Sequence, residues 1–286
     1  MKLILAYYFL KNLLKNMVIR KPPDKIHEIQ FNKLKKLLRF AYRNNKYYRE
    51  LFEKNNLTPD SFRVLEDITK FPVSDRADIT NSFPDKIVSS GFKLGKNCFL
   101  VSTSGSTGVP IKVYKSYDTI FSTISLGSKR FMKKIFDIDK ITIMTILVYA
   151  PETIEQVISD FALKSRRVPF RKINALDDVE VYIENLNQFK PEILFTYPSV
   201  LKDIKLYLNS SGERIHSPKI IFTSGEIFEK EIRKEILNLF PGSRIVDTYF
   251  CTEAGLIASN CAVSDKMHVL KDRVYLEILD KNGVPV

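Results

Sequence analysis

The chain has 286 residues, of which 44% are hydrophobic and 27% are charged, a balance that excludes collagen-like and wholly disordered proteins. This length predicts one large domain or two smaller ones. No apolar run reaches the roughly 18 residues of a membrane span, and the cysteines Cys98, Cys251 and Cys261 are too few for a disulfide framework. Without a cleavable signal pattern, we expect a cytoplasmic protein.

The net charge of +12 is concentrated near the N-terminus. Residues 1–50 hold 13 lysines and arginines against 3 acidic residues, and they begin with an apolar run at Leu3–Leu10. This pattern favours a helix packed on the body with a solvated basic face. A peripheral membrane contact through residues 1–20 is the alternative, since lysines beside an apolar face can meet anionic headgroups. We expect no nucleic-acid partner, because no reading motif accompanies the charge.

The predicted elements begin with a helix over residues 24–55, where Ile26, Ile29 and Leu34 recur at helical spacing. Residues 57–95 are rich in turn signals. From residue 97 onward, strands alternate with helices. The expected strands are 97–103, 111–115, 141–149, 192–196, 219–223, 244–250 and 273–279. The expected helices between them are 117–134, 151–164, 176–189, 198–210 and 227–239.

This alternation predicts an α/β fold with a largely parallel sheet. At the C-terminus, Asp280–Gly283 has the sequence of a hairpin turn, and a short return arm follows the strand expected at 273–279. A hairpin with an incomplete second arm leaves an open sheet edge, which proteins normally avoid. We therefore expect the chain to be a truncated form of something longer.

A loop rich in hydroxyl groups follows the strand predicted at 97–103. Within it, Thr103–Gly108 contains four hydroxyl side chains and two glycines. Glycine lets the backbone approach a ligand, and exposed N–H and hydroxyl groups can surround phosphate oxygens. The Gly-Lys-Ser/Thr of a Walker A loop is missing from this segment. From composition alone, a plain flexible loop stays open as an interpretation.

Two more polar loops follow predicted strands. Phe222–Glu226 ends the strand 219–223, and Asp247–Glu253 ends the strand 244–250. Because parallel strands end at the same edge of a sheet, we expect the three loops to converge on one face. Glu253 offers a hard oxygen ligand for magnesium, and Tyr249 offers a face on which a base can stack.

The ordered trio Thr-Ser-Gly-Ser-Thr-Gly, Ser-Gly-Glu and Tyr-x-x-Thr-Glu resembles the adenylate-forming (acyl-CoA synthetase) superfamily. Within it, the sequence is most similar to the phenylacetate–CoA ligase and capsular-polysaccharide-biosynthesis branch, which Lys33–Tyr42, Phe71–Val73 and Thr196–Ser199 also resemble. The resemblance covers nearly the whole chain. It implies the large N-terminal domain of these enzymes, with layered, mostly parallel sheets and helices.

In terms of domains, we expect a helical, basic segment over 1–95 packed on the core. An α/β nucleotide-binding core over 96–270 follows it, and the start of a truncated β subdomain occupies 271–286.

Members of this superfamily activate a small carboxylic acid with ATP through an acyl-adenylate, and CoA is often the acceptor. The resemblance therefore implies an acid–CoA ligase that uses ATP and magnesium, in a surface-polysaccharide context. The residues that it implies at the nucleotide are Thr103, Ser104, Gly105, Ser106, Thr107, Gly108, Ser224, Gly225, Glu226 and Tyr249. It also implies two catalytic residues, Thr252 at the α-phosphate and Glu253 as the magnesium ligand.

Two departures from the family pattern bear on activity. Phe250 stands where the common pattern has glycine. Family members also continue into a small C-terminal domain with a catalytic lysine, and we expect that domain to be absent after Val286. Losing its positive charge at the α-phosphate should slow adenylation by orders of magnitude. The alternatives are a non-catalytic relic that at most binds ATP and a basic membrane-surface or scaffold protein.

Cys261 and His268 match, by position, two residues that join two downstream cysteines at zinc in the phenylacetate–CoA ligase branch. The downstream pair is missing from the sequence, and a structural zinc site needs a full tetrahedral ligand set. We favour a buried thiol and a hydrogen-bonded imidazole, with a partial zinc site as the alternative. Cys251 shows no histidine partner in the sequence, so we interpret it as a packing residue rather than a nucleophile.

Overall fold

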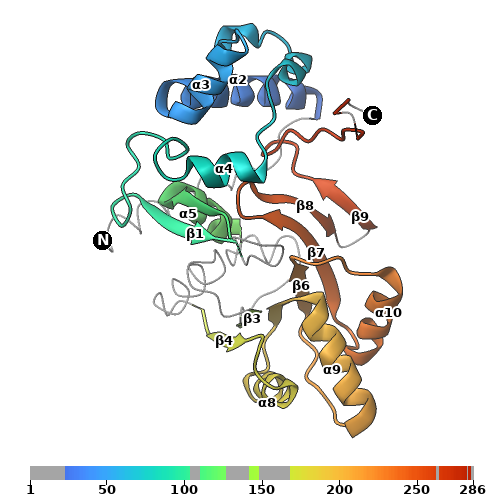
Figure 1. Cartoon of the computed structure of the whole chain (residues 1–286). Coiled ribbons are helices and arrows are strands. Elements are labelled where there is room, and N and C mark those ends of the chain that lie inside the picture. Colours follow the sequence, from blue (N-terminus) through green and yellow to red (C-terminus); the bar gives the residue numbers. More distant parts are fainter. Residues whose placement is uncertain are drawn as a thin grey trace. The chain divides into compact units, whose positions relative to one another are not determined.

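The computed structural model describes residues 23–103, 110–126, 142–147, 168–261, 264–281 and 283–284. The chain divides into two compact units, whose elements are labelled in Figure 1. Unit 1 comprises Met1–Ile120 together with Val269–Val286, and unit 2 comprises Phe121–His268. Each unit has its own hydrophobic core.

A seven-stranded sheet forms the centre of unit 2, with its strands in the order β4, β3, β5, β6, β7, β8, β9. The strands are β3 (Ile143–Leu147), β4 (Phe170–Asn174), β5 (Ile193–Thr196), β6 (Ile220–Ser224), β7 (Arg244–Cys251), β8 (Gly255–Cys261) and β9 (Ser264–Val269). The strands from β4 to β7 are parallel, and β7 pairs with β8 in the antiparallel direction. The predicted α/β fold with a largely parallel sheet is confirmed.

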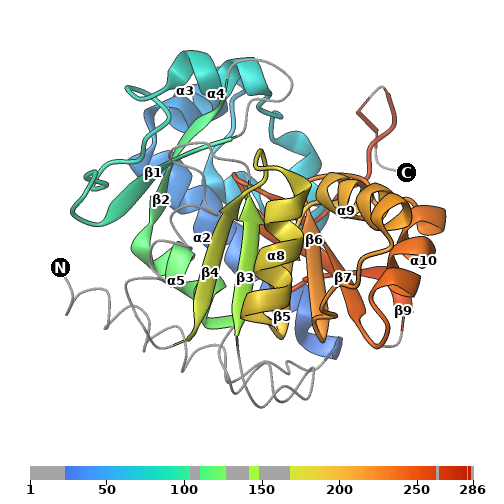
Figure 2. The same cartoon turned by 90° about the horizontal axis from the view of Figure 1, so that it is seen from below.

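Three helices cover one face of this sheet, as Figure 2 shows: α8 (Val179–Phe189), α9 (Pro198–Ser211) and α10 (Lys230–Leu239). Successive side chains of a strand point to opposite faces, so every second strand residue meets these helices. The core between sheet and helices contains Met144, Ile146, Leu194, Ile221 and Ile245 from the strands, and Ile183, Leu186, Leu201, Ile204, Ile236 and Phe240 from the helical side. This core fixes α9 against β5 and β6.

In its described residues, unit 1 contains the short 3-10 helix η1 (Pro23–Lys25), followed by two adjacent helices, α2 (Ile26–Asn44) and α3 (Lys46–Lys54). Asn45 separates them, because its backbone is extended (φ −125°, ψ 118°) and its side chain accepts a hydrogen bond from Tyr48 N at 3.1 Å. The rings of Phe52, Phe62 and Phe71 form an aromatic core, with Phe52 and Phe71 centroids 5.0 Å apart. The predicted helix over 24–55 is therefore two helices.

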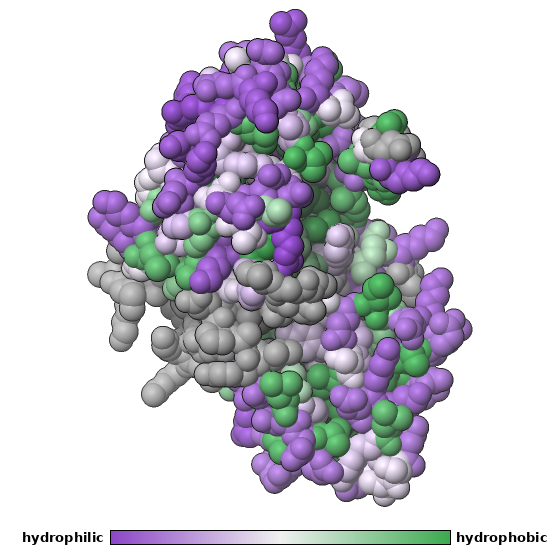
Figure 3. All heavy atoms as spheres, in the orientation of Figure 1, coloured by the Kyte–Doolittle hydropathy of each residue, from purple (hydrophilic) through white to green (hydrophobic). Residues whose placement is uncertain are grey.

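The rest of unit 1 contains short helices and a two-stranded sheet. These elements are η2 (Pro59–Ser61), η3 (Leu65–Lys70), α4 (Arg76–Ser82), the antiparallel strands β1 (Cys98–Ser102) and β2 (Lys112–Ser116), and α5 (Tyr117–Leu126), which continues into unit 2. Figure 3 shows mainly hydrophilic side chains over α2 and α3. On α2, Lys33, Lys36 and Arg39 are exposed. None of the helices in the described part of the chain has both the length and the apolar character to cross a membrane.

Most predicted strands and helices are confirmed within the described residues. The strands expected at 97–103, 111–115, 141–149, 192–196, 219–223 and 244–250 appear as β1, β2, β3, β5, β6 and β7. The helices expected at 176–189, 198–210 and 227–239 appear as α8, α9 and α10, and α5 covers the start of 117–134. The helix expected at 151–164, the end of 117–134 and residues 1–20 lie outside the described residues.

The strand expected at 273–279 is wrong. Residues 274–278 form no strand, and Tyr275 packs against the aromatic core of unit 1 instead. The turn after it is confirmed: Gly283 N donates to Asp280 O at 3.0 Å, and Asp280 N donates to Val284 O at 2.8 Å. Strands β4, β8 and β9 were not predicted.

Acid is expected to weaken unit 1 through the buried carboxylate of Asp67. This side chain accepts hydrogen bonds from Lys70 Nζ (2.6 Å), Val64 N (2.9 Å) and Arg63 N (2.6 Å). The Lys70 ammonium and the two backbone N–H groups hold the pKa of Asp67 well below its usual range. Since the folded pKa is depressed, the stabilisation is present above the unfolded pKa of about 3.9 and is lost as pH falls below it.

The check is the melting temperature measured between about pH 7 and pH 2. We expect Asp67→Asn to melt lower than the parent at pH 7 and to lose less on acidification. Asp85→Asn, at an exposed aspartate, is the control and should follow the parent curve. Parallel curves for Asp67→Asn and the parent would contradict this expectation.

Candidate functional site

Several of the residues singled out by the sequence come together at the carboxyl edge of the unit 2 sheet. Strands β5, β6 and β7 are parallel and end at this edge. Ser224, the last residue of β6, lies in register with Thr248 of β7, next to Tyr249. The Ser224–Glu226 loop and Tyr249 are therefore neighbours on one edge, where open α/β sheets bind ligands.

The Ser224–Glu226 loop is held against the start of α9. Gly225 has a φ of +83°, and a Cβ placed on it would lie 3.5 Å from Cε1 of Tyr197. Only glycine adopts this backbone conformation without strain. Glu226 uses both carboxylate oxygens, because Oε2 accepts from Ser199 N at 2.7 Å and Oε1 accepts from Ser199 Oγ at 2.8 Å. The contact with Ser199 was not predicted from the sequence.

A chain of buried polar contacts lies beneath this loop and joins three strands. Thr223, which is fully buried, donates from Oγ1 to Asp247 Oδ1 at 2.8 Å. Thr248 Oγ1 donates to Thr223 O at 2.7 Å, and Asp247 N donates to Asn260 Oδ1 at 2.9 Å. These bonds tie β6, β7 and β8 together where the loops leave the sheet. No sequence pattern predicts the pairing of Thr223 with Asp247 or the contact of Asn260.

The Tyr-x-x-Thr-Glu segment forms the end of β7 and a tight turn into β8. Tyr249 is 55% exposed, so its ring is available to a ligand. The pairing register shifts between Tyr249 and Phe250, at the position where the family pattern has glycine. In the turn, Cys251 Sγ accepts from Ala254 N at 3.3 Å. Glu253 lies in this turn with its side chain exposed.

The hydroxyl-rich loop belongs to unit 1, between β1 and β2. Thr103 closes its base, because Thr103 N donates to Ile111 O at 3.0 Å and Ile111 N donates to Thr103 Oγ1 at 3.0 Å. The predicted nucleotide ligands Ser104, Gly105, Ser106, Thr107 and Gly108 lie outside the described residues. The expectation that this loop ends a strand of the same parallel sheet as the other two is wrong, because β1, among the described strands, pairs only with β2 in a separate antiparallel sheet.

Comparison with known proteins decides the family. Residues 47–285 match the family model described as AMP-binding enzyme. The chain belongs to the AMP-binding enzyme family. The phenylacetate–coenzyme A ligase of Aromatoleum evansii is 24% identical over 269 residues, which cover 90% of this chain and 58% of that ligase. Protein CapK of Staphylococcus aureus is 23% identical over 219 residues, which cover 75% of this chain and 48% of CapK.

A solved structure shares the AMP-binding fold of this chain. The structure of a 2-hydroxyisobutyryl-CoA ligase in complex with 2-HIB-AMP matches with a TM-score of 0.77 at 16% identity, over 93% of this chain and 57% of that one. This likeness confirms the fold predicted from the sequence, the N-terminal domain of adenylate-forming ligases. The chain spans about half the length of these relatives, from 48% to 58%.

Zinc ligation by Cys261 and His268 stays a prediction. His268 lies on β9 with an exposed side chain, whereas the side chain of Cys261 lies outside the described residues. Within the described part of the chain, no group of three or more histidine, cysteine, aspartate or glutamate side chains could hold a metal ion.

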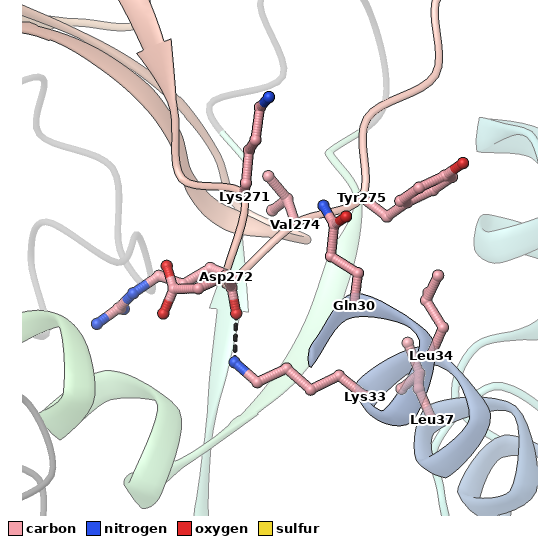
Figure 4. A pocket seen from close by; sticks show the side chains of 9 residues that line it. Gln30, Lys33, Leu34, Leu37, Lys271, Asp272, Val274 and Tyr275 are labelled. Carbon is pink, nitrogen blue, oxygen red and sulfur yellow. Dashed lines mark hydrogen bonds between the residues drawn. The ribbon is translucent and has the colours of Figure 1, made fainter. Parts of the chain in front are cut away.

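A small cavity in unit 1 lies between α2 and residues 271–275 (Figure 4). Its volume is about 70 Å³, far below the roughly 300 Å³ or more of small-molecule sites. Gln30 and Lys33 line it from α2, and Lys33 Nζ donates to the backbone oxygen of Asp272. No residue of the nucleotide motifs lines this cavity, so it is not the nucleotide site that the AMP-binding family implies.

Proposed function

We propose that the protein activates a carboxylic acid with ATP through an acyl-adenylate and passes the acyl group to the thiol of CoA. The observation that carries this proposal is the meeting of the Ser224–Glu226 loop with Tyr249 at the carboxyl edge of a parallel sheet. Family membership supports it, as do relatives whose names are those of acid–CoA ligases. Surface-polysaccharide biosynthesis is the context that the sequence resemblance adds to the proposal.

The reaction needs positioning and charge neutralisation more than covalent help from the protein. An oxygen of the acid attacks the α-phosphorus of ATP, forming the acyl–phosphate bond as the bond to pyrophosphate breaks. In this proposal the adenine lies between the Ser224–Glu226 loop and the exposed ring of Tyr249. Thr252 contacts the α-phosphate, and Thr103–Gly108 contact the β- and γ-phosphates. The thiolate of CoA then takes the acyl group and AMP leaves.

Glu253 is the proposed magnesium ligand. Its exposed carboxylate on the turn after β7 fits this role, because Mg²⁺ usually binds through few carboxylates together with substrate phosphates and water. When bound, the ion neutralises charge on the phosphates. Glu253 would hold it at the turn, which the hydrogen bond from Ala254 N to Cys251 Sγ closes.

A thermal-shift experiment with ATP and magnesium tests the proposal. At a hundredfold excess over Kd, binding should add about 2.7 kcal/mol of stability, which for this chain is a shift of about 5–10 °C. We expect Glu253→Ala to reduce the shift with ATP and magnesium. Glu231→Ala, at an exposed position on α10, is the matched control and should shift as the parent does.

Three outcomes separate the alternatives. A folded parent without any shift would contradict nucleotide binding. If the melting temperature of Glu253→Ala rises as much as that of the parent, Glu253 is not the magnesium ligand. A shift without acid-dependent exchange of pyrophosphate into ATP would leave a protein that binds nucleotide but forms no adenylate.

A further inference from the structure

The first turn of α9 is tied to the chain segment that leaves β6. Ser199 bonds to Glu226, and two ion pairs follow along the same helix, Lys202 with Glu229 at 3.8 Å and Lys205 with Glu235. The last two connect α9 to the start and middle of α10. Of these three contacts, only the one between Ser199 and Glu226 involves a residue of the Ser224–Glu226 loop.

The Ser199–Glu226 contact is exposed to solvent, and it joins the loop to the N-terminal end of a helix. Ser199 N is one of the N–H groups at a helix start that have no partner inside the helix. A carboxylate at this end also interacts favourably with the helix dipole. Pro198 is the first helical residue, and its fixed φ suits the start of a helix. The side chains of Val200, Leu201 and Ile204 are buried, so α9 itself is firmly packed. The acceptor side chain of Glu226 is thereby held on a rigid support.

Tyr197 also lies against the loop, beside Gly225. It precedes Pro198, which restricts its backbone to the extended region observed (φ −103°, ψ 149°). Its ring faces Gly225, with Cε1 at 3.5 Å and Cδ1 at 3.6 Å from the position of an added Cβ. The segment Thr196–Ser199, which resembles the family, therefore contacts two consecutive residues of the loop, Gly225 through Tyr197 and Glu226 through Ser199.

We propose that Ser199 and Glu226 are positioning residues, which hold the Ser224–Glu226 loop in the shape that receives the adenosine part of the nucleotide. This proposal rests on the proposed function. Because both oxygens of Glu226 bond to Ser199, the carboxylate acts through the loop backbone and does not itself need to contact the nucleotide. A loop released from α9 must be ordered again when the nucleotide binds, and that ordering weakens affinity.

The experiment measures the Kd of AMP and of ATP with magnesium, by titration calorimetry, for the full chain and its variants. We expect Glu226→Ala to weaken both nucleotides by the same factor, about tenfold, as for loss of a charge-assisted hydrogen bond. Ser199→Ala should weaken them by about threefold, since the bond from Ser199 N stays. Ser199→Thr keeps a hydroxyl and should bind as the parent does. The double variant should match Glu226→Ala alone, because the two residues act as one unit.

Lys205→Ala is the matched control, since it removes the contact of α9 with Glu235 but leaves the loop untouched. It should bind both nucleotides as the parent does, and melting of the nucleotide-free variants shows that all are folded. If the parent binds neither AMP nor ATP, the proposed function itself is wrong. If the parent binds them and Glu226→Ala binds equally well, the positioning role is wrong. Equal weakening by Lys205→Ala, or losses that multiply in the double variant, would also overturn it.

Discussion

Replacing Phe240 by alanine is expected to lower the free energy of unfolding of unit 2 by about 3–5 kcal/mol. Phe240 follows α10 and is fully buried in the core between the sheet and its three helices. Truncation removes a whole aromatic ring from a close-packed interior, and the cavity left behind adds to the lost transfer free energy. Urea unfolding followed by circular dichroism measures the change.

Phe195→Ala is the control for this prediction. Phe195 lies on β5 of the same sheet, where it stacks on Phe222 with centroids 4.7 Å apart but is 39% exposed. We expect a clearly smaller loss, on the order of 1 kcal/mol, because less apolar surface leaves water on folding and one ring pair is broken. Equal losses in the two variants would show that Phe240 is not the core residue that its burial indicates.

The second large effect is expected at the hydrogen-bonded pair of buried Thr223 and half-buried Asp247. Asp247→Ala leaves the fully buried hydroxyl of Thr223 without its acceptor, which is expected to cost about 1–3 kcal/mol of stability. Thr223→Val removes the donor instead, and a loss of similar size is expected, about 1–2 kcal/mol. Combining the two should lose less than the sum, with a coupling of about 0.5–3 kcal/mol.

A double-mutant cycle in urea tests this coupling. The control pair is Thr223→Val with Lys205→Ala, because Lys205 belongs to a separate contact on α9 and its effect should add. Additive losses for Thr223→Val and Asp247→Ala would mean that the hydrogen bond does not couple β6 to β7. Coupling would identify Asp247 as a structural member of the polar motif that ends in Glu253.

The parallel core of unit 2 was predictable because its strands are short apolar runs with helices between them, as Ile220–Ser224 illustrates. The edge strand β4 was not, since Arg171 and Lys172 hide its pattern, and charged residues are common on edges. β8 begins at Gly255 and includes Ser259 and Asn260, residue types that usually mark turns. β4 and β8 form because each pairs with a neighbouring strand, β3 and β7 respectively.

The errors in unit 1 have similar physical causes. Residues 273–279 alternate between apolar and polar side chains as a strand does. The alternation does not show what the apolar side chains pack against, and Tyr275 packs against the aromatic core. The helix over 24–55 breaks at Asn45, whose side chain caps α3 and whose residue type favours caps over helix interiors.

In the candidate site, the Ser-Gly-Glu and Tyr-x-x-Thr-Glu segments could be found from sequence because glycine and polar residues directly follow apolar strands. Their placement at one edge follows from parallel strands. The partner of Glu226 could not be found, since Ser199 is 27 residues away along the chain and serine is common at helix starts for local reasons. Likewise, Asn260 contacts Asp247 N only because β8 folds back beside β7.

The chain passes from unit 1 into unit 2 and back, and this order has a consequence for folding during synthesis. Tyr275 and Asp272 contact the α2 region of the same unit, although they follow all of Phe121–His268 in the sequence. A ribosome therefore releases every strand of the unit 2 sheet up to His268 before it releases Tyr275. The buried core of unit 1 comes from residues 38–71, which leave the ribosome early, but the part of its surface that Tyr275 covers stays exposed until the end of synthesis. Newly made chains arrested before Tyr275 should consequently keep α2 and α3 folded around this core, with faster hydrogen exchange beside the surface that Tyr275 covers than in the full chain.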